Sequence, residues 1–89
     1  MRNAVEFFVW ETDTYSLSVT LEPEANEFVV RPGERLAFAP SSPTEDFHWA
    51  MQIDHQRHSI QLFPESRENY GDIEIYKNGV LDENWESLL

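Results

Sequence analysis

Hydrophobic and polar side chains alternate along most of this chain, which is the pattern of half-buried β-strands. The clearest run spans residues 15 to 21 and places four side chains on one face, Tyr15, Leu17, Val19 and Leu21. Residues 4 to 10 are rich in β-branched and aromatic side chains, and residues 11 to 14 carry turn-forming side chains. The pattern predicts a hairpin between these first two strands.

The segment from Phe28 to Phe38, FVVRPGERLAF, contains a turn signal between two apolar runs. Proline suits the first central position of a type II turn, and Gly33 suits the second, where φ is positive. The segment resembles the strand, Pro-Gly-Glu turn and strand of bacterial immunoglobulin-like and cupredoxin-like sandwiches, which implies a fold class and no activity. A type II turn splays a tight hairpin, so the segment fits either a splayed hairpin or an arch between facing sheets. Four side chains would then point inward, Phe28, Val30, Leu36 and Phe38.

A second hairpin can be checked by its own register. If residues 55 to 58 form a four-residue loop, Asp54 lies opposite Ser59. This register also pairs Ile53 with Ile60, Met51 with Leu62 and Gln52 with Gln61. Apolar side chains then meet apolar ones and amides meet amides, as a correct register requires. The strand also places Trp49 on its buried face.

The last third of the chain carries a third hairpin signal, Asn78-Gly79 between apolar runs, which is typical of a type I′ turn. Beyond it, the spacing of Leu81, Trp85, Leu88 and Leu89 fits either a short C-terminal helix capped by Asp82 or an extended tail. The sequence therefore predicts one all-β domain over residues 1–89. Its expected architecture is a small antiparallel β-sandwich, immunoglobulin-like or cupredoxin-like, or an open barrel, with seven or eight short strands.

Length and composition argue against an enzyme. A chain of 89 residues has little room for an enclosed active site. Its 3 glycines are isolated, so there is no phosphate-binding loop. Ser59 follows His58, but neighbouring strand residues point to opposite faces and cannot form a nucleophile and base pair. We expect no catalytic residues and no cofactor.

The charge is strongly negative and uneven along the sequence. Seventeen acidic and 6 basic residues give a net charge of -11. Residues 1 to 30 contribute six acids and one base, and residues 64 to 89 contribute seven acids and two bases, so the middle is nearly neutral. Such a field opposes contact with nucleic-acid phosphates and anionic lipid, and favours basic proteins. An acidic surface that serves only solubility is the alternative.

Exposed tryptophans beside carboxylates would suit an interface with a basic partner, since aromatic side chains supply contact area and acids supply steering. The residues expected to contribute are Trp10, Glu65, Glu68, Asp72, Glu74, Asp82, Glu83 and Trp85. Peripheral core packing is the other explanation for the tryptophans. The predicted function is a small acidic intracellular binding module, for instance an inhibitor or an immunity-type protein; a nucleic-acid mimic that occupies a DNA-binding protein is a variant of it.

Two other function classes remain open. Asp54, His55 and His58 at the tip of the second hairpin could ligate a divalent metal such as zinc, although Arg57 lies inside that loop. Alternatively, the domain could associate with itself through an edge strand, in an oligomeric state that the sequence does not define. With 0 cysteines and no apolar run near 20 residues, a cytoplasmic location and no membrane contact are expected.

Overall fold

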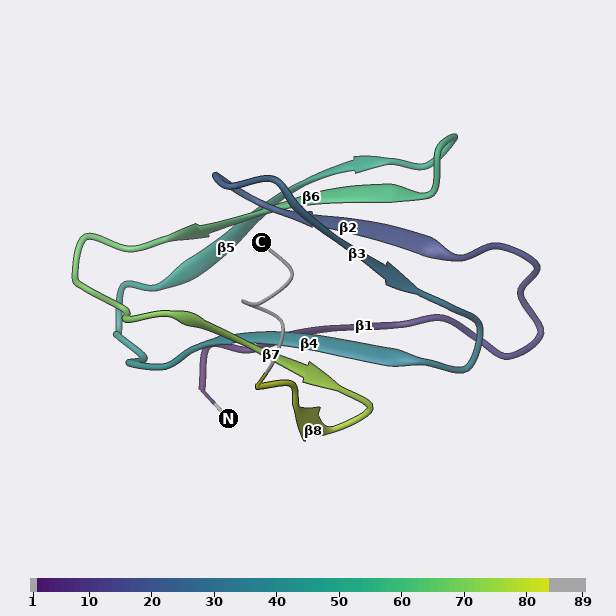
Figure 1. Cartoon of the computed structure of the whole chain (residues 1–89). Helices are drawn as coiled ribbons and strands as arrows, with labels where there is room; N and C mark the ends of the chain where they lie inside the picture. Colours follow the sequence, from purple (N-terminus) through teal and green to yellow (C-terminus); the bar gives the residue numbers. More distant parts are fainter. Residues whose placement is uncertain (1, 84–89) are drawn as a thin grey trace.

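The strands form two four-stranded sheets that pack face to face as a sandwich (Figure 1). This computed structural model describes residues 2–83. Sheet A has the order β1-β4-β7-β8 and sheet B has the order β3-β2-β6-β5. The strands are β1 Val5–Phe8, β2 Leu17–Leu21, β3 Asn26–Val30, β4 Arg35–Pro40, β5 His48–Asp54, β6 Ser59–Glu65, β7 Ile73–Lys77 and β8 Val80–Leu81. The predicted all-β sandwich is confirmed, with eight strands and no helix in residues 2–83.

The core lies between the two sheets, where alternate side chains of each strand meet. The most deeply buried large side chains are Val19, Val30, Phe38, Leu62 and Ile75. Phe38 lies at the centre of an aromatic cluster, with its ring edge-on to those of Phe7, Phe28 and Trp49 at 6.1, 5.4 and 6.4 Å. The alternation of apolar and polar residues therefore places apolar side chains of both sheets in one shared core.

The Pro-Gly turn joins the two sheets, which is the arch that the sequence offers as the alternative to a hairpin. β3 lies in sheet B and β4 in sheet A, and the turn between them closes through the Glu34 amide, which donates to the Arg31 carbonyl at 2.9 Å. Gly33 has a φ of +87°, which only glycine adopts freely. Its amide donates to the Val9 carbonyl at 2.7 Å, so the arch also holds the segment that follows β1.

The predicted hairpin of the first two strands is wrong. β1 pairs with β4 in sheet A, whereas β2 pairs with β3 and β6 in sheet B. Val9 is buried in the connecting segment, which crosses from one sheet to the other. Crossing lets the apolar faces of β1 and β2 pack against a shared core, while a hairpin would place both in one sheet. Tyr15 is also outside β2 and is 62% exposed, so its expected burial is wrong too.

The register of the β5–β6 hairpin is confirmed residue by residue, from Asp54 opposite Ser59 to Met51 opposite Leu62. The burial is uneven across these pairs, because β5 is the edge of sheet B and β6 lies inside it. Leu62 is fully buried, whereas Met51 is 41% exposed and Ile53 is 65% exposed. Trp49 lies on the expected inward face and is half-buried.

One pair departs from the expected antiparallel arrangement. β2 and β6 lie side by side in parallel at the centre of sheet B, with Val19 opposite Ile60 and Leu21 opposite Leu62. Both strands bury apolar side chains on the core face. The two hairpins β2–β3 and β5–β6 are therefore joined along their inner strands, which makes sheet B a mixed sheet.

The last hairpin follows the Asn78-Gly79 signal. β7 and β8 pair as Lys77 with Val80, and both turn residues have positive φ, 52° and 82°. This confirms the type I′ turn that the sequence predicts. The predicted C-terminal helix falls on residues 84–89, outside the described residues. Within residues 2–83 no helix has the length and hydrophobicity that crossing a membrane requires.

Candidate binding cleft at the acidic end

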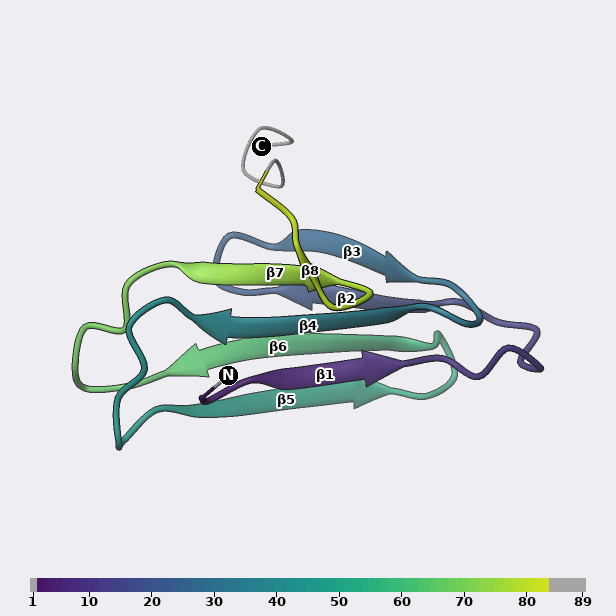
Figure 2. The same cartoon turned by 90° about the horizontal axis from the view of Figure 1, so that it is seen from below.

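The strands run along the length of the sandwich, so their connections gather at its two ends (Figure 2). One end holds the β2–β3, β4–β5 and β6–β7 connections, and the other holds the β1–β2, β3–β4, β5–β6 and β7–β8 connections. We call these the acidic end and the mixed end, according to their charged residues.

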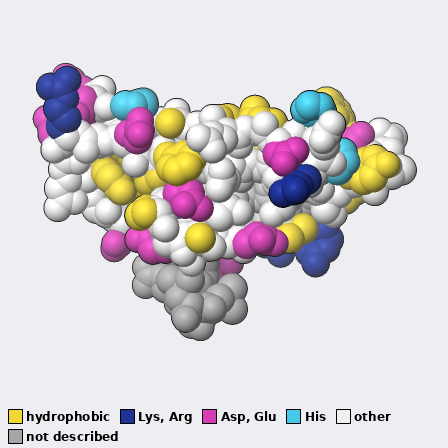
Figure 3. All heavy atoms as spheres, turned by 90° about the horizontal axis from the view of Figure 1, so that it is seen from above, with side chains coloured by type: hydrophobic (Ala, Val, Ile, Leu, Met, Phe, Trp, Pro, Cys, Tyr) yellow, Lys and Arg dark blue, Asp and Glu magenta, His cyan; other side chains and the backbone are white. Residues whose placement is uncertain are grey.

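The acidic end and its margin carry most of the carboxylates: Glu22, Glu24, Glu45, Asp46, Glu65, Glu68, Asp72, Glu74, Asp82 and Glu83. Arg67 and Arg2 are the bases there. At the mixed end Arg31, Arg35, Arg57 and Lys77 stand beside Glu11, Asp13, Glu34 and Asp54. Figure 3 shows most of the visible Lys, Arg and His side chains near one end of the outer face of sheet B. Folding thus brings acids from distant parts of the sequence to one end.

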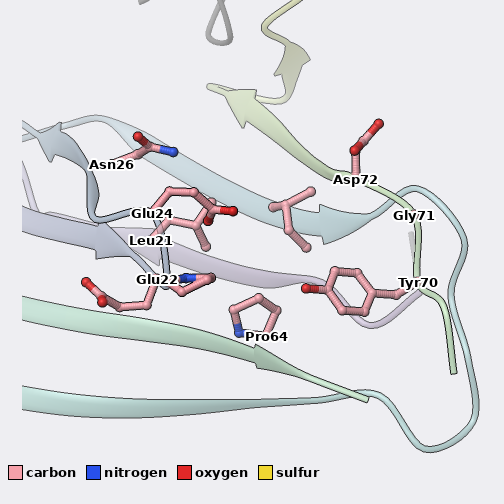
Figure 4. A pocket seen from close by; sticks show the side chains of 10 residues that line it. Leu21, Glu22, Glu24, Asn26, Pro64, Tyr70, Gly71 and Asp72 are labelled. Carbon is pink, nitrogen blue, oxygen red and sulfur yellow. The ribbon is translucent and has the colours of Figure 1, made fainter. Parts of the chain in front are cut away.

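A cleft opens at the acidic end between the β2–β3 turn and the β6–β7 loop (Figure 4). Its volume is about 390 Å³, and we call it the acidic cleft. It is lined by Leu21, Glu22, Pro23, Glu24, Asn26, Pro64, Tyr70, Gly71, Asp72 and Ile73. The Tyr70 hydroxyl points across the cleft toward the β2–β3 turn, whereas the Asp72 side chain points away from it (Figure 4). The cleft therefore has apolar and aromatic walls with carboxylates at its rim.

Asp72 and Ile73 also line a second hollow of about 260 Å³ beside β8. Its other lining residues are Ser41, Glu74, Leu81, Asp82 and Glu83. Because the two hollows share residues, they form one acidic surface that runs from the β2–β3 turn to the end of β8. The Glu74 carboxylate accepts a hydrogen bond from the Tyr76 hydroxyl at 3.3 Å. The pKa of Tyr76 is raised by desolvation and by the neighbouring Glu74 carboxylate.

The β6–β7 loop is held in place by the β4–β5 loop. The Ser42 amide donates to the Tyr70 carbonyl at 2.9 Å, and the Asp72 amide donates to the Ser41 hydroxyl at 2.9 Å. Gly71 has a φ of +75°, and a Cβ there would collide with the Ser41 hydroxyl. Only glycine allows the two loops to approach so closely. This contact fixes one wall of the acidic cleft.

Asp46 provides a second connection between the same loops. Its carboxylate accepts hydrogen bonds from the Ser66 hydroxyl at 2.6 Å, the Thr44 hydroxyl at 2.9 Å and the Arg67 amide at 2.8 Å. The Ser66 hydroxyl and the Arg67 amide are the main causes that lower the pKa of Asp46 to about 2. This carboxylate is therefore occupied in holding the two loops together.

The structure brings together four of the acids that the sequence singles out, Asp72, Glu74, Asp82 and Glu83, around one hollow. Glu68 lies nearby in the β6–β7 loop, and Glu65 is engaged with the His48 ring at 2.7 Å. Trp10 lies apart from them at the mixed end, 68% exposed, with its ring edge-on to Phe8 at 5.2 Å. Trp85 lies outside the described residues.

The proposed metal ligands occupy the tip of the β5–β6 hairpin at the mixed end. The Asp54 carboxylate accepts from the Arg57 amide at 3.2 Å and lies 3.7 Å from its guanidinium. The His58 ring stacks on Tyr15 with 4.2 Å between ring centroids. Across residues 2–83 no group of three or more His, Asp or Glu side chains is arranged to hold a metal ion. The hairpin tip does not assemble these side chains into a ligand set.

Sequence reasoning missed Glu22, Glu24 and Tyr70 in the cleft, and Asp46 between the β4–β5 and β6–β7 loops. Glu22 and Glu24 flank Pro23 in a turn, a position that marks only a break in the strand pattern. Tyr70 lies in a polar loop, where an isolated aromatic residue was the one available signal. Comparison with known proteins adds no further guide, because no protein-family model, curated protein or solved structure matches the chain.

Proposed function

We propose that this chain is a small acidic binding module that holds a basic segment of a partner protein in the acidic cleft. The observation that carries the proposal is that the β2–β3 turn and the β6–β7 loop meet around one hollow, with the Tyr70 ring in its wall and Glu22, Glu24 and Asp72 at its rim. A lysine or arginine side chain combines an apolar stem with a charged head. Its stem would pack on Tyr70 and the prolines, and its head would meet the rim carboxylates.

The size of the cleft supports a side chain as the occupant. A volume of about 390 Å³ is near the lower limit of small-molecule pockets, which are roughly 300–1,000 Å³. The residues that flank this side chain in the partner segment would then lie along the adjoining acidic surface beside β8. An inhibitor or an immunity-type protein that binds a basic partner is the function class that fits. The absence of cysteine is our ground for proposing the cytoplasm as its location.

An NMR titration of the labelled protein with a short peptide that alternates arginine and glycine tests this proposal. We expect the amide signals of Glu24, Tyr70 and Asp72 to shift and saturate, while those of Trp10 and Arg57 at the mixed end stay in place. Because the interaction is largely electrostatic, the affinity should fall about tenfold or more between low and moderate salt. Equal shifts of the amide signals at both ends would mean that the peptide is attracted by the net charge alone and has no specific site in the cleft.

Two variants with the same change in charge separate the cleft from the overall field. The first combines Glu22→Gln, Glu24→Gln and Asp72→Asn, and the second combines Glu11→Gln, Asp13→Asn and Glu27→Gln. We expect the first to lose most of the peptide binding and the second to keep most of it. A native partner recovered from cytosol should likewise bind the second variant more strongly than the first. Equal losses in both variants would contradict the proposal.

A further inference from the structure

β5 is the longest free edge of the sandwich. Its 7 residues equal the length of β6, with which it pairs, and no other described strand pairs with it. The other edge strands are shorter, with 4 residues in β1, 5 in β3 and 2 in β8. A free edge presents unpaired amides and carbonyls, which can pair with another strand.

β5 also lacks the features that usually protect an edge from pairing. Proteins blunt edge strands with proline, lysine, inward charges or bulges. β5 contains neither proline nor lysine, and its titratable side chains, His48 and Asp54, lie at its two ends. Between them Met51 and Ile53 share the inward face with Trp49 and are 41% and 65% exposed. This face is apolar and only partly covered by sheet A.

The sequence of β5 is complementary to itself in the antiparallel direction. When two copies of the strand are related by a two-fold axis through Met51, Met51 faces Met51 and Trp49 faces Ile53 of the second copy. On the other face Ala50 lies opposite Gln52, and His48 lies opposite Asp54. On the inward face apolar residues then oppose apolar residues, and at each end of the paired strands an imidazole opposes a carboxylate. This is the one antiparallel register that pairs all 7 residues of both strands.

The charge around β5 is compatible with such pairing, although the whole molecule is strongly acidic. Arg57 lies beside Asp54 at one end of the strand, and His48 lies beside Glu65 at the other. By contrast, the β3 edge carries Glu27 and follows the acidic β2–β3 turn. Like charges would repel there, since two copies would bring their carboxylates together.

We propose that two copies of this chain associate through antiparallel pairing of their β5 edges, centred on Met51. The two four-stranded B sheets become one continuous sheet across the two-fold axis. Met51 then lies beside Met51 of the second copy, and Ile53 lies beside its Trp49. The acidic clefts lie away from the axis and stay open, so the dimer does not depend on the proposed function.

Sedimentation velocity over about 10–500 μM protein tests the association, because a dimer is favoured by mass action. We expect the unmodified chain to shift toward the dimer mass with concentration and Ile53→Lys to stay monomeric. Val80→Lys is the matched control, since Val80 is 69% exposed on the β8 edge and should leave the dimer unchanged. A monomer throughout, or equal effects of both lysines, would overturn the proposal.

A cysteine variant tests the register itself, because the chain has 0 cysteines. Directly opposed residues in an antiparallel pair have Cβ atoms about 4.5–5.5 Å apart, close to disulfide reach. With oxidised glutathione, Met51→Cys should form covalent dimers much faster than Val80→Cys. Similar rates in the two variants would show that random collision, and not pairing at β5, brings the thiols together.

Discussion

Asp46 shows how one residue can connect loops that are distant in the sequence. Three donors from residues 44, 66 and 67 converge on its carboxylate and lower its pKa from 3.8 to about 2. A group whose pKa falls on folding stabilises the folded state above its unfolded pKa. That contribution is present above pH 3.8 and is lost as the pH falls toward about 2.

We expect Asp46→Asn to lower the melting temperature at neutral pH. The difference in melting temperature between this variant and the unmodified chain should shrink between pH 4 and pH 2, in the window set by the pKa values of 3.8 and about 2. Thermal unfolding followed by circular dichroism across this range checks the prediction. Glu45→Gln, at the exposed neighbouring position, is the control and should have little effect at any pH. A difference for Asp46→Asn that persists unchanged at pH 2 would contradict this role.

At the scale of elements, the two strands of the β5–β6 hairpin show that register and burial are separate properties. Met51 and Leu62 are direct partners, yet Leu62 is fully buried and Met51 is 41% exposed. Leu62→Ala leaves a cavity in the shared core and should lower the free energy of unfolding by about 2–5 kcal/mol. Met51→Ala removes a half-covered side chain and should cost roughly 1 kcal/mol or less.

Urea denaturation of the two alanine variants at low protein concentration, where association is negligible, measures this difference. The unfolding slope should be similar for both, because each changes the folded state and leaves the exposed surface on unfolding nearly the same. Equal losses of stability would mean that the outer strand is as well covered as the inner one.

Local pairings could be predicted from the sequence, and contacts between distant segments could not. The β5–β6 register and the Asn78-Gly79 turn follow from residues close together in the chain. The pairing of β1 with β4 and of β2 with β6 depends on which strands share a sheet and in what order. Alternation along the sequence does not specify that order. For the same reason, Asp72 could be selected as an acidic residue, while its meeting with Glu22 and Tyr70 in one cleft could not.

At the scale of the whole molecule, the asymmetric charge has an energetic cost. Carboxylates gathered at the acidic end repel one another, and the repulsion weakens as salt shortens the screening length to about 10 Å at 0.1 M. We therefore expect the melting temperature to rise by a few degrees between about 10 mM and about 200 mM NaCl.

The charge-neutralised cleft variant should melt higher than the unmodified chain at low salt, and this advantage should shrink as salt is added. The melting temperature of the variant with the same charge change at Glu11, Asp13 and Glu27 should rise less, because those acids are farther apart and lie partly among basic residues. Scanning calorimetry of the three proteins at two salt concentrations distinguishes the effects. A salt-independent gain in the cleft variant would point to a cause other than repulsion.

The parallel pair at the centre of sheet B has a consequence for the order in which the chain folds. The β2–β3, β5–β6 and β7–β8 hairpins each close over short connections, whereas β2 and β6 are separated by three whole strands. Closing long loops is entropically expensive, so local hairpins form early and distant pairings form late. We expect the joining of β2 to β6 to limit the folding rate, and folding to take milliseconds to seconds, as in other β-sandwiches.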